Sequence, residues 1–411
     1  MWSVVLAVLS AVALVTLGDL RAAPMAAVGV MMAWGLGVWS VPRPRTRSLA
    51  ILVGLAATVR GIVLLSPASL SDDLYRYLWE GSVVLQGGNP YLHPPADPIW
   101  NVYADDVILQ QVNHPEVSAV YPPLALLLFA TLSALHHGPL VVKAFMALCD
   151  VGTVWALGKT LQLRGRSLDG AWLYALLPLG VIESAGSGHL EALGVLSIAL
   201  AVLAWEQGRS GIGWAGLGAL LKFLPGPLLP ALSRRSPWLF GAVGAVGVLS
   251  ILPFIDAGPA LIRGLSTYAT HWRFNAGGFV LFDLVFGDLA RPLAVLTGAV
   301  VTAWACLRMR QPARVALWVG GAFVLLSPTV HPWYVLWAWV PALLCGVRSW
   351  TWLAVMAPLS YVVLTTLDPV TGAWEEAPWP AAVQFIPLVA LLLWEARTHL
   401  LQPGPWAPER A

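Results

Sequence analysis

The chain has 411 residues, of which 58% are hydrophobic and only 11% are charged, and its mean hydropathy is +0.74. These values exclude an ordinary soluble globular protein and predict a protein that crosses a membrane many times and is surrounded by membrane lipids. The formal net charge of +2 gives no reason to expect a nucleic-acid partner.

Apolar segments of membrane-spanning length follow one another along most of the chain. At roughly 17 to 25 residues per helix, about twelve crossings and one long loop use the whole length, so residues 1–411 are predicted to form a single integral membrane domain. The first segment lacks the basic start of a signal peptide and is interpreted as a membrane helix. The predicted spans are residues 1–17, 24–41, 48–66, 139–160, 171–187, 189–206, 237–255, 288–307, 312–328, 332–347, 349–367 and 380–397.

Basic residues mark the connectors on one side of the predicted bundle. Because Lys and Arg are enriched in cytoplasmic loops, they place the N-terminus inside and the protein, with its many crossings, in the cytoplasmic membrane. Residues 67–138 then form a long extracytoplasmic loop with interfacial helices, one of them the short apolar run Leu124 to Leu135. The basic connectors contain Arg43, Arg45 and Arg47; Lys159, Arg164 and Arg166; Arg234 and Arg235; and Arg308, Arg310 and Arg314.

The external loop begins with a strongly polar run, Ser71-Asp-Asp-Leu-Tyr-Arg-Tyr-Leu-Trp-Glu80. Ionisable groups near a membrane are costly to desolvate, so such a cluster is retained where water, substrate or a counter-charge meets it. If Ser71 caps a helix that begins at Asp72, four polar side chains share one helix face: Asp73, Arg76, Tyr77 and Glu80. On its own, the run is equally well interpreted as an amphipathic helix anchored in lipid headgroups by its aromatic residues.

A second unusual segment, residues 212–233, contains Lys222-Phe-Leu-Pro225-Gly-Pro227 in its middle. Two prolines and a glycine break a helix there, which predicts a re-entrant pair of half-helices that returns the chain to its starting side. Lys222 then lies deep in the protein and must line a cavity. Further polar motifs map to the external side and predict one shared cavity: Tyr121-Pro-Pro-Leu124, Gly186-Ser-Gly-His-Leu-Glu191, His271-Trp-Arg-Phe-Asn275 and Ser327-Pro-Thr-Val-His-Pro-Trp-Tyr334.

In this order, the motifs resemble those of the polytopic glycosyltransferases of the GT-C superfold, especially the bacterial polyprenyl-phosphate-mannose-dependent mannosyltransferases. The resemblance implies an all-α polytopic membrane protein, a GT-C-like bundle of about twelve transmembrane helices with re-entrant and interfacial helices and one long first external loop. The matching elements are Ser71 to Gly81, Gly88-Asn-Pro-Tyr91, His114-Pro with Tyr121-Pro-Pro-Leu124, Gly188-His-Leu-Glu191, Lys222-Phe-Leu-Pro225 and Ser327 to Tyr334.

The resemblance implies that Asp73 is the catalytic base, with Asp72 as the close alternative. A polyprenyl phosphate leaves without protonation, so one carboxylate that takes the proton of the acceptor hydroxyl is enough, and the anomeric configuration is inverted. Nucleotide sugars are cytoplasmic and the predicted site opens to the other side, so a lipid-linked sugar is the expected donor.

Other polar residues are candidates for binding the substrates. Candidates for the donor phosphate are Arg76 and Lys222, followed by His331, Arg263 and Arg273. Candidates for other substrate contacts are Tyr121, His189, Glu191 and Glu80. Each has a structural alternative: Tyr121, where some relatives carry a lysine, fits an interfacial anchor, His331 a helix start, and His189 with Glu191 a solvated turn.

No cofactor and no metal ion are predicted. Asp72, Asp73 and Glu80 offer hard oxygen ligands, but no further ligand spacing supports a metal site. Asp105 and Asp106 are predicted to cap a short helix outside the site. The cysteines, Cys149, Cys306 and Cys345, are interpreted as small core residues.

Together these observations predict an inverting glycosyltransferase at the outer face of the membrane. It moves a hexose, with mannose preferred, from a polyprenyl-phosphate-linked donor to a glycan or glycolipid acceptor. The main alternative is a polytopic lipid or sugar transporter, or flippase, without transferase chemistry, because broken helices and a buried lysine also occur in transporters. Polar residues gathered at one face, with no inverted repeat, argue against it. A non-catalytic membrane assembly factor is a third interpretation.

Overall fold

The computed structural model describes residues 2–42, 48–368 and 372–399, and within them the chain is helical, with an isolated β-bridge between Phe274 and Thr329 and no strand. This confirms the all-α part of the predicted fold class. The basic connector with Arg43, Arg45 and Arg47 lies outside the described residues.

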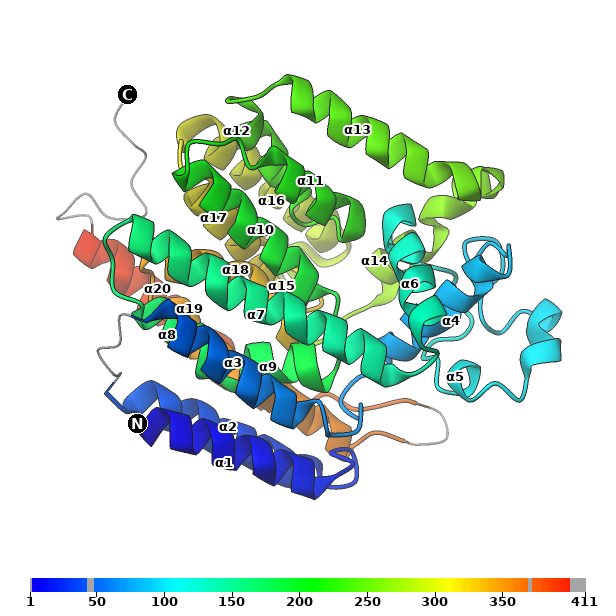
Figure 1. Cartoon of the computed structure of the whole chain (residues 1–411), viewed down its shortest axis with the longest axis horizontal. Helices are drawn as coiled ribbons and strands as arrows, with labels where there is room; N and C mark the ends of the chain where they lie inside the picture. Colours follow the sequence, from blue (N-terminus) through cyan, green and yellow to red (C-terminus); the bar gives the residue numbers. More distant parts are fainter. Residues whose placement is uncertain (1, 43–47, 369–371, 400–411) are drawn as a thin grey trace.

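The N-terminal half packs as a layer of helices that run side by side (Figure 1). Helix α7 contacts both α3 and α10, and α1 contacts α2 and α3. The core is formed by the apolar sides of these helices, which pack against one another and are therefore shielded from solvent or lipid. The elements are α1 (Trp2–Leu17), α2 (Pro24–Ser40), α3 (Leu49–Val63), α7 (Pro139–Leu163), α8 (Asp169–Leu176), α9 (Pro178–Val181), the π-helical turn η2 (Ile182–Gly186) and α10 (Glu191–Glu206).

The segment between α3 and α7 lies at one end of the molecule, opposite the N-terminus, and is drawn in cyan in Figure 1. Its helices α4 and α6 pack tightly, because Gly81 has no side chain: a Cβ there would lie 2.3 Å from the carbonyl oxygen of Phe129. The elements are α4 (Asp73–Leu85), η1 (Pro98–Tyr103), α5 (Val107–Gln110) and α6 (Pro123–Leu135).

Helix α4 differs from the sequence prediction in two ways. It begins at Asp73 with Asp72 at the N-cap position, although Ser71 Oγ still accepts a hydrogen bond of 3.3 Å from the backbone N–H of Asp73. Most of the helix is buried, including Arg76 and Glu80. An amphipathic helix lying on the membrane surface would leave its polar face exposed, so that interpretation is wrong.

The predicted break at Lys222 is confirmed. Helix α11 (Ile212–Leu221) ends with Lys222 at its C-cap, and the chain continues through η3 (Gly226–Leu228) into the short α12 (Leu229–Ser233). The Ser210 hydroxyl donates a hydrogen bond of 3.1 Å to the carbonyl of Leu232, so the segment returns to the place where it started.

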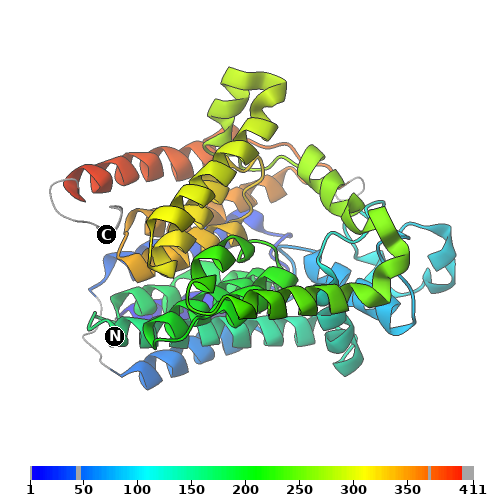
Figure 2. The same cartoon turned by 90° about the horizontal axis from the view of Figure 1, so that it is seen from above.

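The C-terminal half contains the remaining helices. Helix α13 leads toward the cyan segment, and Figure 2 shows this green part of the chain reaching the same end of the molecule. The Asn89 side-chain amide donates a hydrogen bond of 2.6 Å to Asp256 and joins the two parts. The elements are α13 (Trp238–Ile251), η4 (Leu252–Ile262), α14 (Arg263–His271), α15 (Phe279–Phe286), η5 (Gly287–Leu289), α16 (Ala290–Arg308), α17 (Pro312–Leu326), η6 (Pro332–Val335), α18 (Leu336–Cys345), α19 (Ser349–Met356), η7 (Ala357–Thr365) and α20 (Pro378–His399).

Three stretches of the described chain are long and apolar enough to cross a membrane: Pro139–Leu163, Trp238–His271 and Pro378–Thr398. The second leaves helical geometry at Phe254 and Gly258. Each of the twelve predicted spans coincides with one helix or with two or three consecutive helical pieces, many of which are shorter than 18 residues. The helix positions therefore agree with the sequence pattern, whereas the number of crossings stays a prediction.

Candidate functional site

The structure brings Asp73, at the first turn of α4, next to the turn that precedes α10. Its carboxylate accepts a hydrogen bond of 3.1 Å from the side-chain amide of Asn113. The other carboxylate oxygen lies 3.9 Å from His189 Nε2. The side chain of Asp73 is 24% exposed, so it is held on one side and accessible on the other.

His189 is fully buried, and its ring is held by two neighbours. Its Nδ1 lies 3.0 Å from Glu183 Oε2, and its ring stacks on Trp333 with 3.6 Å between the ring centroids. Its Nε2, which faces Asp73, has no hydrogen-bond partner among the described residues. Gly188 makes the turn possible, because its φ of +72° lies in the left-handed region.

Glu183 is a site residue that the sequence prediction missed. It lies in the π-helical turn η2, and both of its carboxylate oxygens accept hydrogen bonds from the Tyr361 hydroxyl, at 2.9 and 3.1 Å. An acidic residue inside the apolar run 171–187 was a usable signal, because an ionisable group within a predicted membrane span marks function by default.

Lys222 and Glu191 form the second charged pair of the site. Lys222 Nζ lies 2.9 Å from Glu191 Oε1 and 5.0 Å from the centroid of the Tyr121 ring. The contact with Glu191 is an ion pair that is not aligned as a hydrogen bond, so both carboxylate oxygens lack a hydrogen-bond partner within the described part of the chain. The carboxylate is fully buried, and buried oxygens without a hydrogen bond indicate a place for water or a hydroxylated ligand.

His331 belongs to a column of stacked rings that leads to His189. Its ring stacks on Trp333 at 4.4 Å and on Phe274 at 5.0 Å, and Trp333 also stacks on His189. His331 stands at the N-cap of η6, so the predicted helix start is confirmed. The structure thus places His331 near His189 without a direct contact between them.

Asp72 points away from this group. Its carboxylate pairs with Arg21 at 2.6 Å, in the connection between α1 and α2. The two neighbouring acids therefore have different surroundings: Asp72 faces a guanidinium, whereas Asp73 faces His189 and Asn113.

Arg76 is buried, and its guanidinium is used within the loop. It donates to Glu80 at 3.2 Å and to the carbonyl oxygens of Asn113 at 2.9 Å, His114 at 2.7 Å and Val117 at 3.0 Å. This geometry does not support the prediction that Arg76 faces a donor phosphate or that Glu80 contacts substrate. Instead, Arg76 holds the loop that presents Asn113 to Asp73.

The two remaining candidates for binding the donor phosphate, Arg263 and Arg273, make no contact with Asp73 among the interactions of the described residues. Arg273 is exposed and pairs with Asp283 at 2.5 Å. Arg263 is exposed at the first position of α14. Asp106 caps α5 by accepting hydrogen bonds from the backbone of Ile108 and Leu109, which confirms that prediction.

Burial and neighbouring charges change the ionisation of the three acids in and before α4. Burial raises the pKa of Asp73, but the positive charge that His189 carries when its ring is protonated, the charge of Lys222 and the hydrogen bond from Asn113 together lower it below its ordinary value. Burial raises the pKa of Asp72, although Arg21 partly offsets this. Burial also raises the pKa of Glu80 to about 7 despite the Arg76 guanidinium. Of these three acids, Asp73 is the one whose pKa is lowered, which favours its ionised, proton-accepting form.

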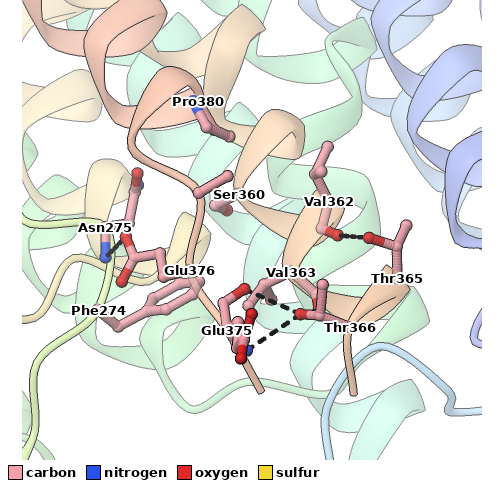
Figure 3. A pocket seen from close by; sticks show the side chains of 11 residues that line it. Phe274, Asn275, Ser360, Val362, Val363, Thr365, Thr366, Glu375, Glu376 and Pro380 are labelled. Carbon is pink, nitrogen blue, oxygen red and sulfur yellow. Dashed lines mark hydrogen bonds between the residues drawn. The ribbon is translucent and has the colours of Figure 1, made fainter.

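A cavity adjoins the column of rings at Phe274 (Figure 3). The hydroxyl of Thr366 and the backbone of Glu375 hydrogen-bond across it, and the Glu376 carboxylate accepts a hydrogen bond of 2.6 Å from the backbone of Asn275. Asp73, His189 and Lys222 are not among the residues that line this cavity. Across the described residues, His, Cys, Asp and Glu form no group of three or more that could hold a metal ion.

The fold and the site together define a class: an all-helical protein, with helices apolar and long enough to cross a membrane, that gathers acidic, histidine and lysine side chains at one end of its bundle. The chain belongs to the family described as alpha-(1->6)-mannopyranosyltransferase, N-terminal domain, whose match covers residues 11–234. This confirms the resemblance predicted from the motifs. The matched region includes the site from Asp73 to Lys222, whereas His331 lies beyond it.

Two relatives extend the comparison. The chain is 28% identical over 351 residues to alpha-(1->6)-mannopyranosyltransferase B of Corynebacterium glutamicum, covering 69% of this chain and 57% of that protein. It is 27% identical over 354 residues to a probable alpha-(1->6)-mannopyranosyltransferase of Mycolicibacterium smegmatis, covering 68% of this chain and 62% of that protein. The chain thus spans about three fifths of the length of these relatives. No solved structure matches it.

Proposed function

We propose that this protein is an inverting mannosyltransferase of the cytoplasmic membrane, with its site on the extracytoplasmic side. It moves mannose from a polyprenyl-phosphate donor to a hydroxyl of a glycan or glycolipid acceptor. The observation that carries the proposal is the setting of Asp73, an ionised and partly exposed carboxylate held by Asn113 beside His189, in a chain of the mannopyranosyltransferase family.

The reaction needs one base and one good leaving group. Asp73 takes the proton from the acceptor hydroxyl while that oxygen forms a bond to C1 of mannose. The bond from C1 to the phosphate oxygen breaks, and its electron pair leaves with the polyprenyl phosphate. Because attack and departure occur on opposite faces of the sugar, the configuration at C1 is inverted.

Lys222 is the cation best placed to receive the donor phosphate. It is half-buried at the end of α11, and its charge lowers the pKa of Asp73, which supports a place for it in the same site. Its partner Glu191 has two carboxylate oxygens without hydrogen bonds. These oxygens can accept hydrogen bonds that the hydroxyls of a sugar donate. The stacked ring of His331 is available at the edge of the group for a further contact.

The proposal of a lipid-linked donor depends on the side of the membrane to which the site is predicted to open. The polar loop and the basic connectors predict a site on the external face, where nucleotide sugars are absent. A lipid-linked sugar reaches that face within the membrane and presents its phosphate at the level of the site.

The proposal is tested with purified protein in proteoliposomes that contain polyprenyl-phosphate-mannose and a mannoside acceptor. We expect Asp73→Asn to lower the transfer rate roughly 100- to 10,000-fold, the size of a lost general base. Asp72→Asn should stay within about fivefold of the wild type, because its partner Arg21 is partly exposed and lies away from His189. Asp106→Asn is the matched control, since asparagine also caps a helix.

Two results would contradict the proposal. Transfer at the wild-type rate by Asp73→Asn would remove the assigned base. Movement of the mannolipid across the bilayer without transfer of mannose would instead identify a flippase.

A further inference from the structure

The buried pair Glu183 and His189 lies directly behind Asp73. His189 Nδ1 is 3.0 Å from the Glu183 carboxylate, and the backbone N–H of His189 also donates to the Glu183 carbonyl at 2.8 Å. Both side chains are almost completely buried. The Tyr361 hydroxyl holds the Glu183 carboxylate from the other side.

This contact determines which ring nitrogen of neutral His189 carries the proton. A carboxylate only accepts hydrogen bonds, so Nδ1 carries the N–H that it donates to Glu183. Nε2 then has a free lone pair. That lone pair faces Asp73 across 3.9 Å and has no other partner among the described residues.

The arrangement differs from that of a histidine kept only for structure. A buried structural histidine has hydrogen bonds at both nitrogens, since an unpaired buried polar atom costs about 1–3 kcal/mol. Here Trp333 stacks against the ring, and Glu183 fixes its rotation, so Nε2 is aimed at the site and left unpaired.

We propose that Glu183 and His189 form a proton-accepting pair that acts through Asp73, an inference that rests on the proposed transferase function. Asp73 takes the proton of the acceptor hydroxyl as the new bond to C1 forms and the phosphate leaves with its electron pair. The proton then passes to His189 Nε2, which restores the Asp73 carboxylate. The resulting imidazolium is stabilised by Glu183 at Nδ1.

The distance of 3.9 Å is compatible with this step. It is longer than a hydrogen bond, so the two groups must approach by about 1 Å, or one water molecule must bridge them, when substrate is bound. Catalytic contacts are often this long in enzymes without substrate and shorten when it binds. The exposed side of Asp73 stays free for the acceptor hydroxyl.

The inference is tested by steady-state kinetics of His189→Gln and Glu183→Gln in the same proteoliposomes. We expect each variant to lower kcat about 10- to 100-fold with the KM values for donor and acceptor unchanged, because the pair acts only after proton transfer begins. Glutamine at position 183 can donate to Nδ1 and so places the proton on Nε2, the wrong tautomer. Glu206→Gln, at the other end of α10 where it pairs with Arg164, is the matched control and should leave both constants unchanged.

The outcomes separate this inference from the proposed function. If Asp73→Asn is inactive while His189→Gln and Glu183→Gln keep the wild-type kcat, the transferase proposal stands and the pair has no role. If a KM rises tenfold with kcat unchanged, His189 binds substrate and the inference is wrong. If wild-type protein transfers no mannose, the proposed function itself fails. Thermal unfolding shows which variant is folded, and either folded variant decides the question.

Discussion

Replacing Arg76 by methionine distinguishes a structural role from the predicted contact with a donor phosphate. Methionine keeps the apolar stem and removes the guanidinium, which leaves Glu80 and three backbone carbonyls without their donor. Breaking a buried ion pair by removing one partner costs about 3–5 kcal/mol. Glu80, whose pKa is already about 7, offsets part of this cost by taking up a proton.

We therefore expect Arg76→Met to lower the free energy of unfolding by about 3 kcal/mol and the apparent Tm by roughly 3–5 °C. Thermal unfolding in detergent micelles, followed by tryptophan fluorescence, measures this change. Adding Glu80→Met should recover part of the loss, because the double variant no longer buries an unpaired carboxylate.

A different pattern would refute the structural role of Arg76. If Arg76→Met unfolds at the wild-type temperature and raises the KM for the donor at least tenfold, the guanidinium binds the phosphate as the sequence predicted. In that case the second substitution at Glu80 should bring no recovery.

Three further predictions follow from the same contacts. Burial raises the folded-state pKa of Glu80 from 4.5 to about 7, so its contribution to stability is present below pH 4.5 and is lost as the pH rises toward 7. Over that interval the wild type should lose about 3 kcal/mol more than Glu80→Gln, measured by unfolding at several pH values, and equal slopes would contradict the burial argument. Gly81→Ala should lower Tm, because the added Cβ would lie 2.3 Å from the Phe129 carbonyl oxygen. The control is Gly61→Ala, whose added Cβ meets no atom within 4 Å. Equal changes in Tm for the two variants would refute the close approach of α4 and α6. Lys222→Met should raise the KM for the donor roughly 10- to 100-fold, which corresponds to the loss of a charge-assisted hydrogen bond. Lys159→Met, on the opposite side, is the control and should leave this KM unchanged. An unchanged donor KM in Lys222→Met would argue against the phosphate contact.

The positions of the helices could be predicted because membrane helices leave a strong and local signal. The spans predicted from runs of apolar residues begin and end within a few residues of observed helices. The two prolines after Lys222 predicted the break between α11 and α12. The shorter pieces within single spans, such as α8 and α9, were not predicted, because Pro178 divides an apolar run whose composition does not change.

The partners of the charged residues could not be predicted, since they come from segments far apart in the sequence. Nothing near Asp72 in the sequence indicates that Arg21 pairs with it, 51 residues earlier. Arg76 matched a motif of the family, but the loop that occupies its guanidinium lies about 40 residues later, at Asn113 to Val117. Sequence spacing fixes which side chains share a helix face, whereas the fold decides which of them meets substrate.

The site residues share a position that explains why they meet. Asp73 begins α4, His189 lies in the turn before α10, Lys222 ends α11, and His331 precedes η6. A helix in an apolar surrounding satisfies its own backbone, so irregular turns are tolerated only where a cavity or another protein segment meets them. Helix ends gathered at one end of the bundle therefore bring these polar groups together. A short polar motif at the end of an apolar run is thus a better guide to this kind of site than any single charged residue within it.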